Sequence, residues 1–391
     1  MYLSDSIGFL LENAGPVIQY RLRKEILRDI STSDEYKLLE QIYQTPNFKL
    51  VESYVKPSGY IGSGAHSWDN WRGEVLHETP LQDGETAARL LSYYAIPKTH
   101  PMIMDFIAAM RDEETLRKEF SYIPPEIERF NNRFLGINSG YCVMALMYAM
   151  QAMLGYGDDD YALPFQGVAL EAFRNILPLS SICEITKARQ SKGNANTNAN
   201  TNANDNVKNK YHYPYIEKNT YLPSQYHLET LAYTRAWRTP ENVKLMADAL
   251  NHYNERIADG FSLHVKIANK YIVPAPLNMH NRPIRAFRSD LIESITYRRL
   301  LTEIVMLGVG ANVGVIKESI ANVEEAIGGD GVLTMKFDAP HNKRYSPKNI
   351  EYPTAYVDVR LEADYKRKYA LECDLTFWAV QFLYLIRENE V

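Results

Sequence analysis

The amino-acid sequence predicts an all-α protein, and within that class an α/α toroid, in which inner helices form a barrel and outer helices surround it. One unit recurs along the chain: a helix, a tight polar turn and a second helix. Helices that are apolar on nearly all sides alternate with helices that have a polar face, and a helix that is apolar all round must be buried. This alternation is typical of concentric helical layers. We expect residues 1–391 to form a single domain, and an open superhelix is the competing arrangement.

The apolar type of helix is clearest in residues 141–154, where Gln151 is the one strongly polar side chain. Its length of ~15 residues is too short to cross a bilayer, which takes about 20. Gly155 is placed to end it in a left-handed cap, and the aspartates at 158–160 are placed to cap the next helix. That next helix, which runs to Pro178, is half polar. Residues 138–178 therefore predict one buried helix followed by one amphipathic helix.

The other helices follow from similar local signals. Pro16 is a first-turn proline near the N-terminus, and Thr239 followed by Pro240 supplies a cap and a first-turn proline. Asp374 is placed to cap a last helix that is apolar nearly all round. The helices expected in this way cover residues 7–11, 16–27, 36–43, 86–95, 102–110, 226–237, 243–253, 297–307, 313–327 and 375–386.

Few segments are expected outside helices. In residues 265–273 apolar and polar side chains alternate, which predicts an arm of a β-hairpin. Residues 190–210 hold an Asn-rich insert that cannot bury apolar surface, so we expect a disordered surface loop there. Residues 328–331 and 340–353 are loops by composition.

The composition supports a sizeable core and excludes some functions. Hydrophobic residues make up 46% and charged residues 23% of the chain, and the net charge of −5 gives no electrostatic footprint for nucleic acid. Cys142, Cys183 and Cys373 are too widely spaced for a metal motif or a disulfide framework. No secretion signal or transmembrane run is present, so we expect a soluble, cytoplasmic protein. The 28 tyrosines either line a cavity or reflect coding bias.

Two stretches resemble a known group of proteins. The first begins at Tyr226-His227-Leu228 and runs to Asn242, and the second covers residues 372–377. Both resemble uncharacterised bacterial proteins with prenyltransferase and squalene-oxidase-type repeats, and the glycine turn at 328–331 is similar to the turns of those repeats. The resemblance implies an α/α toroid with a central cavity, as in terpenoid cyclases and protein prenyltransferase β-subunits. It also implies an isoprenoid-like or other small-molecule ligand.

The catalytic motifs of those enzymes are absent from this sequence. It contains no Asp-x-Asp-Asp acid, and the Asp158-Asp159 pair lacks the third aspartate of a magnesium motif, since Ala162 stands there. Residues 372–374 lack the Asp-x-Cys of a zinc site. Dinucleotide, Walker A and His-Glu-x-x-His motifs are also missing, which argues against cofactor-dependent redox chemistry and phosphoryl transfer. The resemblance therefore extends to the fold and not to the activity, and we assign no cofactor or metal.

The densest cluster of reactive side chains precedes the first predicted helical pair. Its members are His66, Trp68, Asp69, Trp71, Glu74, His77 and Glu78. Glu74 and His77 would share one face of a helix, and a general acid–base pair drawn from Asp69, Glu74 and His77 is chemically reasonable, because histidine titrates near neutral pH. The alternative is a surface loop that is anchored by its tryptophans and carries solvated charges.

Further candidates lie later in the chain. Tyr226 and His227 precede a buried helix and are placed to act as base and acid at a cavity mouth; alternatively, His227 is a first-turn or core histidine. His280 lies in a polar loop, where it would bind an anion or carboxylate or serve no site at all. We expect Trp378 to line the cavity with Trp68 and Trp71.

Three functions follow as hypotheses. The first is a toroid that binds a hydrophobic or small organic molecule and acts as a cyclase, lyase or isomerase. The second is a carbohydrate-active α/α barrel, either a lyase or a hydrolase, with tryptophans stacked on sugar rings. The third is a non-enzymatic helical scaffold, which predicts a filled centre and an exposed apolar patch.

Overall fold

Helices dominate the part of the chain that the structure describes, and the all-α class is confirmed. The computed structural model describes residues 2–62, 64, 83–119, 142–188, 214–217, 222–256, 264–267, 270–272, 295–327, 329–334, 360–362 and 367–388. The helices up to the first strand are α1 (Tyr2–Asn13), α2 (Pro16–Arg21), the π-helix η1 (Leu22–Leu27), α3 (Thr32–Tyr43), α4 (Pro46–Ser53), α5 (Gly84–Tyr93), α6 (Pro101–Arg111), α7 (Glu113–Glu119), α9 (Cys142–Met153), α10 (Leu163–Arg174) and the short 3₁₀ turn η2 (Ile182–Glu184). The later ones are α11 (Gln225–Ala232), α12 (Pro240–Arg256), α14 (Ile295–Met306), the short 3₁₀ turn η4 (Gly310–Asn312), α15 (Gly314–Ile327) and α16 (Ala370–Glu388).

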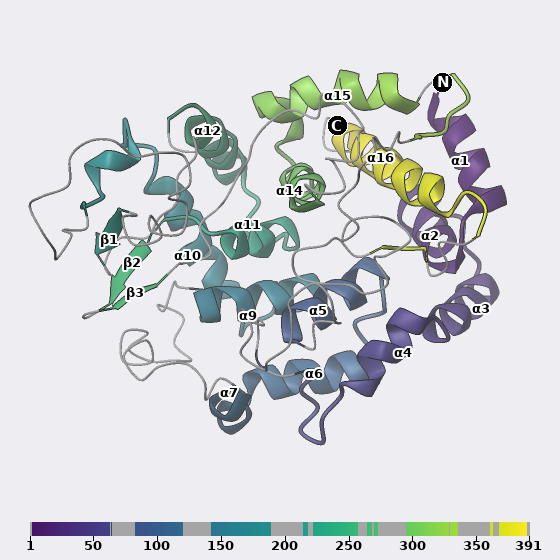
Figure 1. The fold of residues 1–391 in the computed structure, drawn as a ribbon, viewed down its shortest axis with the longest axis horizontal. Helices are drawn as coiled ribbons and strands as arrows, with labels where there is room; N and C mark the ends of the chain where they lie inside the picture. Colours follow the sequence, from purple (N-terminus) through teal and green to yellow (C-terminus); the bar gives the residue numbers. More distant parts are fainter. Residues whose placement is uncertain are drawn as a thin grey trace, which may run out of the picture.

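Helices from distant parts of the sequence form a connected series in the interior. α5 contacts α9, α9 contacts α11, α11 contacts α14, α14 contacts α16, and α16 contacts α2 and η1. Figure 1 shows α5, α9, α11, α14 and α16 towards the middle of the molecule, with α3, α4, α6, α12 and α15 at its periphery. α10 packs on both α11 and α12. The contacts therefore join helices that lie far apart in the sequence.

The helix predicted to be most deeply buried is α9. Its residues 144–153 are all buried, and Gln151, its one strongly polar side chain, accepts a hydrogen bond from Arg111 Nε at 2.8 Å. The pairing satisfies the side-chain oxygen of Gln151, which would otherwise be costly to bury. As predicted, Gly155 follows with a left-handed backbone (φ +84°), a conformation that glycine adopts without steric cost. The sequence signal for this buried helix is confirmed.

Two further caps match the local sequence. α2 begins with Pro16 at its first turn, and α12 begins at Pro240, directly after Thr239. The Thr239 hydroxyl accepts the backbone N–H of Asn242 at 3.3 Å. A proline loses no helical hydrogen bond at this position, because first-turn N–H groups have no partner within the helix.

One predicted cap is wrong, because the carboxylate serves a long-range contact. The helix expected to start after Asp374 begins at Ala370, and Asp374 Oδ1 accepts the backbone N–H of Leu361 at 3.0 Å. The prediction for the aspartates at 158–160 is correct in part: Ala162, the N-cap of α10, has no side-chain cap of its own, but its backbone N–H donates to Asp159 Oδ1 at 3.1 Å. Asp158 instead accepts the backbone N–H of Arg235 at 3.0 Å. The turn before α10 is thereby tied to the residues that follow α11.

The predicted β-hairpin arm is present at one edge of the molecule. β2 (His264–Ile267) pairs antiparallel with β3 (Lys270–Ile272), and β1 (Tyr215–Glu217) pairs parallel with β2 on its other side. The Asn-rich insert at 190–210 and the loop at 340–353 lie outside the described residues. Within the described part of the chain, no helix is long and apolar enough to cross a membrane.

Replacing Gly157 with alanine is expected to destabilise the fold by about 1–3 kcal/mol, because core positions without spare room resist added atoms. A β-carbon at Gly157 would lie 2.8 Å from Ala152 Cβ and 2.9 Å from its Cα, and would also collide with the Thr234 methyl group. The matched control is Gly167→Ala in α10, where an added β-carbon meets nothing within 4 Å. For Gly167→Ala we expect the free energy of unfolding to rise by about 0.5–1 kcal/mol, because alanine has the higher helix propensity. Urea denaturation followed by circular dichroism measures the stability of both variants. Equal changes in stability would contradict the close packing around Gly157.

Candidate functional site

A partly open cavity of about 640 Å³ lies among several of these helices. Its wall is built from α2 and η1, the end of α5, the residues that follow α11, α14 and α16. Five aromatic side chains line it: Tyr93, Tyr233, Phe377, Trp378 and Tyr384. A concave site with aromatic walls and a few polar groups is the usual form of a small-molecule pocket.

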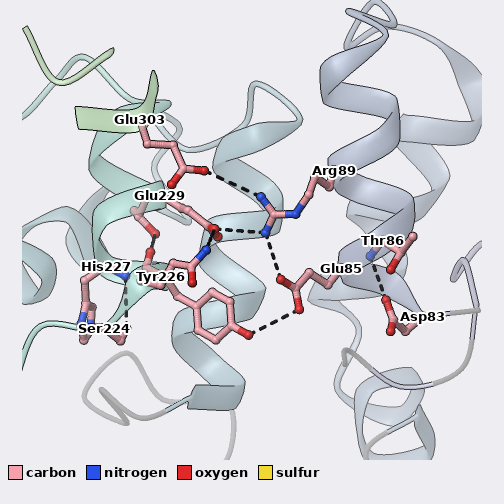
Figure 2. Close-up of polar contacts among 11 residues, drawn as sticks. Asp83, Glu85, Thr86, Arg89, Ser224, Tyr226, His227, Glu229 and Glu303 are labelled. Atoms are coloured by element: carbon pink, nitrogen blue, oxygen red, sulfur yellow. Dashed lines mark hydrogen bonds and ion pairs between the residues drawn. The ribbon is translucent and has the colours of Figure 1, made fainter. Parts of the chain in front are cut away.

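Beside this cavity lies a buried cluster of four charged side chains. Arg89 on α5 directs its Nη2 atom at Glu85 Oε1 (2.9 Å) and at Glu229 Oε1 of α11 (3.0 Å). Its Nη1 atom lies 3.7 Å from Glu303 Oε1 of α14. Figure 2 shows the guanidinium group between the three carboxylates. All four residues are at most 2% exposed: Glu85 2%, Arg89 1%, Glu229 0% and Glu303 1%.

Two neutral side chains extend the cluster. Gln225 Nε2 donates to Glu229 Oε1 at 2.9 Å, and the Tyr226 hydroxyl donates to Glu85 Oε2 at 3.4 Å. Both residues stand in the first turn of α11. The Tyr226 hydrogen bond therefore joins the first turn of α11 to α5, in addition to the ion pair between Glu229 and Arg89.

The local sequence explains how α5 places its two charges. Asp83 caps α5 by accepting the backbone N–H of Thr86 at 2.8 Å, which fixes the start of the helix. Glu85 and Arg89 then stand four residues apart, on one face and in the orientation that favours an ion pair. A sequence search for such pairs would find Glu85 and Arg89, but the partners on α11 and α14 have no local signal.

The electrostatics keep Arg89 charged. Burial alone lowers the pKa of Arg89, but the carboxylates of Glu229 and Glu85 outweigh this effect and hold it well above its usual value. One guanidinium is thus shared by three carboxylates among the described residues. Buried charges seldom stabilise a fold more than well-packed apolar side chains would, but removing one partner of such a cluster is strongly destabilising.

Glu303 connects the cluster to the cavity. It is the member whose side chain lines the cavity wall, while Glu85, Arg89 and Glu229 lie behind it. Its neighbour Thr302 accepts a hydrogen bond from Trp378 Nε1 at 2.9 Å, which fixes that ring beside α14. A carboxylate in this position can accept a proton, accept hydrogen bonds or pair with a cation.

Two arginines in the cavity wall, Arg21 and Arg28, each pair with a glutamate that also lines the cavity. Arg21 makes a two-pronged contact with Glu25, with Nε–Oε1 and Nη2–Oε2 distances of 3.0 and 2.9 Å. Arg28, whose backbone is left-handed (φ 55°), pairs with Glu388 at 2.6 Å. Arg21 and Glu25 flank the junction of α2 with η1, and π-helical turns occur frequently at functional sites.

The predicted site residues fall into three groups. Tyr226 is brought to Glu85 of the buried cluster. Trp378 lies in the cavity wall, and a role in binding stays a prediction. His66, Trp68, Asp69, Trp71, Glu74, His77 and His280 lie outside the described residues. The acid cluster itself was missed by sequence reasoning.

His227 occupies the first-turn position that was the alternative to a catalytic role. Its Nδ1 accepts the backbone N–H of Ser224 at 3.0 Å, while the Ser224 hydroxyl accepts the N–H of His227, so the two form a capping box. Figure 2 shows its ring turned towards Ser224. The side chain is fully buried, and burial lowers its pKa to about 4, so His227 is neutral at physiological pH.

Two further kinds of site, a reactive cysteine and a metal centre, were considered among the described residues. Cys373 is a buried thiol, as predicted, and burial raises its pKa to about 12, so it is a poor nucleophile. Within the same regions, no group of three His, Cys, Asp or Glu side chains has an arrangement that could hold a metal ion.

Fold and site together define a mostly helical protein with an aromatic-walled cavity and a buried arginine–glutamate cluster. No family model matches the chain, and no curated protein or solved structure is significantly similar to it.

Replacing Arg89 with methionine is expected to lower the free energy of unfolding by about 3–5 kcal/mol, because it leaves buried carboxylates without their cation. The control is Arg117→Met in α7. Arg117 also pairs with a glutamate four residues earlier, but both side chains of that pair are about half exposed, and we expect a change within about 0.5 kcal/mol. Thermal and urea unfolding measure the stability of both variants. Similar losses of stability would show that the burial of Arg89 does not make its ion pairs more important than the exposed pair of Arg117.

The fold is expected to lose stability as the pH falls from 6.5 towards 4, because unfolded His227 binds a proton in this range and native His227 does not. The span of about 2.5 units corresponds to about 3 kcal/mol. His227→Gln keeps a Ser-x-x-Gln capping box and removes the titration. The difference in unfolding free energy between wild type and variant is measured at pH 7 and at pH 4, and its change between the two pH values gives the contribution of His227. A difference that does not change with pH would contradict the lowered pKa of His227.

Proposed function

We propose that the chain is an α/α toroid whose central cavity binds a small polar organic molecule. The observation that carries this proposal is the convergence of α2, α5, α11, α14 and α16 on one cavity. These helices are separated in the sequence by helices that Figure 1 shows at the periphery, as a double-layered barrel requires. The resemblance to prenyltransferase-type repeats supports the same architecture.

The lining favours a polar ligand over an isoprenoid chain. Four basic and four acidic side chains contribute to it: Arg21, Lys24, Arg28, Arg235, Glu25, Glu303, Asp374 and Glu388. An apolar ligand that filled the cavity would strip water from these groups without replacing its hydrogen bonds, which is costly. The aromatic side chains give a flat apolar surface on which a ring or a methylated group can rest.

A binding protein fits this interior better than a scaffold does. A helical scaffold requires a filled centre, whereas these inner helices surround open volume that ends at a buried carboxylate. The carbohydrate-active alternative draws on the same features, because sugars also combine polar hydroxyl groups with a flat apolar face.

The test uses tryptophan fluorescence with two variants of the same kind. Polar ligands (sugars, amines and carboxylates) and an isoprenoid alcohol are screened against wild type, Trp378→Phe and Trp237→Phe. Trp237 is a buried control whose Nε1 donates to Leu231 O at 2.8 Å away from the cavity wall. We expect polar ligands to change the emission of wild type and Trp237→Phe but not of Trp378→Phe.

Calorimetry on the same variants measures affinity independently of fluorescence. Trp378→Phe is expected to weaken binding by about fivefold, as for the loss of one aromatic contact of ~1 kcal/mol. If the isoprenoid alcohol binds and the polar compounds do not, the proposal of a polar ligand is wrong and the cavity binds an apolar ligand. Absence of binding by every compound would overturn the cavity as a functional site.

A further inference from the structure

We propose that the ligand of this cavity carries a carboxylate that docks against Arg235 in the cavity wall. This inference rests on the proposed function and names the chemical class of the ligand. It is carried by the partners of the charged side chains in the lining and by the turn that presents Arg235.

Each of the four acidic side chains in the described lining already has a partner within the protein. Glu25 and Glu388 each pair with an arginine of the same wall, at 2.9 and 2.6 Å. Glu303 belongs to the buried cluster around Arg89, and Asp374 accepts a backbone N–H at 3.0 Å. A cation that entered the cavity would have to compete with these contacts.

Three of the four basic side chains in the described lining are engaged in the same way. Arg21 and Arg28 are the partners of the two glutamates, and Lys24 pairs with Glu35 at 2.7 Å. Arg235 differs from them, because its side chain makes no ion pair or hydrogen bond in the part of the chain that the structure describes. The described lining therefore offers a positive charge to a ligand, while its acidic groups are occupied.

The turn that carries Arg235 is fixed by contacts of its backbone. Both carboxylate oxygens of Asp158 accept the backbone N–H of Arg235 at 3.0 Å, and Oδ1 also accepts that of Ala236 at 2.9 Å. Arg238, the other arginine of this turn, donates from its guanidinium to backbone carbonyls, including Thr234 O at 3.1 Å. The backbone is thus held without help from the Arg235 side chain. A fixed backbone lowers the ordering cost when that side chain binds a ligand.

Neutral groups of the same wall can add hydrogen bonds and a flat surface. Tyr233, two residues before Arg235, and Gln381 on α16 both line the cavity, and their side chains make no hydrogen bond within the described regions. Burial raises the pKa of Tyr233, so its hydroxyl stays protonated and can donate to a carboxylate oxygen. Trp378, fixed by its hydrogen bond to Thr302, adds an aromatic face on which a ring can rest. We therefore expect an acid that is carried on a ring.

A carboxylate fits this wall better than a phosphate does. A phosphate monoester carries close to two negative charges at neutral pH, and proteins usually bind it with several cations or backbone N–H groups. A carboxylate carries one charge, and the two oxygens match the fork of a guanidinium group. One unpaired arginine in the described lining, Arg235, is sufficient for it.

The experiment compares three carboxylates with their primary amides, which have nearly the same shape and no charge. The pairs are benzoate and benzamide, cyclohexanecarboxylate and cyclohexanecarboxamide, and glucuronate and glucuronamide. Calorimetry at constant ionic strength measures the ratio of affinities within each pair. In at least one pair we expect the carboxylate to bind about fivefold more tightly, the size expected for an ion pair that keeps contact with water.

Arg235→Gln is expected to reduce this ratio to about one, because it removes the charge and keeps a polar side chain. The matched control is Arg256→Gln at the end of α12. Arg256 is also exposed and makes no ion pair within the described regions, but it lies outside the described lining, so the ratio should not change. Circular dichroism establishes that both variants are folded.

Three results would overturn the carboxylate at Arg235 while the proposed function stands. The first is that the amides bind as tightly as their acids, and the second is that other polar compounds of the screen bind and none of these acids does. The third is a preference for the acids that Arg235→Gln leaves intact, which would place the carboxylate elsewhere. If the acids, the amides and every compound of the screen fail to bind, the proposed function falls as well.

Discussion

The guanidinium group of Arg89 is the point at which three inner helices are held in register. It contacts Glu85 of its own helix, Glu229 on α11 and Glu303 on α14. Glu229 lies 140 positions after Arg89 in the chain, and Glu303 lies further still. A buried charge tolerates little displacement of its partners, because each lost contact leaves a charge in a medium of low polarity. α11 and α14 can therefore slide little against α5, and the position of the cavity wall follows from this constraint.

The same constraint explains why the cavity has both a rigid frame and a reactive group. Apolar side chains at these positions would pack the helices at lower electrostatic cost, but they would place no ionisable group at the wall. Glu303 belongs to the frame through Arg89, and it also stands among the residues of α14 that form the cavity wall. Trp378, fixed by Thr302 on the adjoining position of α14, places an aromatic ring next to that carboxylate.

Sequence patterns predicted the elements whose causes are local. The burial of α9, the left-handed Gly155, the proline start of α12 and the arm of β2 and β3 all depend on residues within a few positions of one another. Predictions that depended on long-range partners failed or were not made. Asp374 was assigned to a helix start, although its carboxylate binds Leu361, and the Arg89 cluster was missed because three of its helices meet only after folding. The periodicity of a sequence shows which side of a helix is apolar, but it does not show which other helix packs against that side.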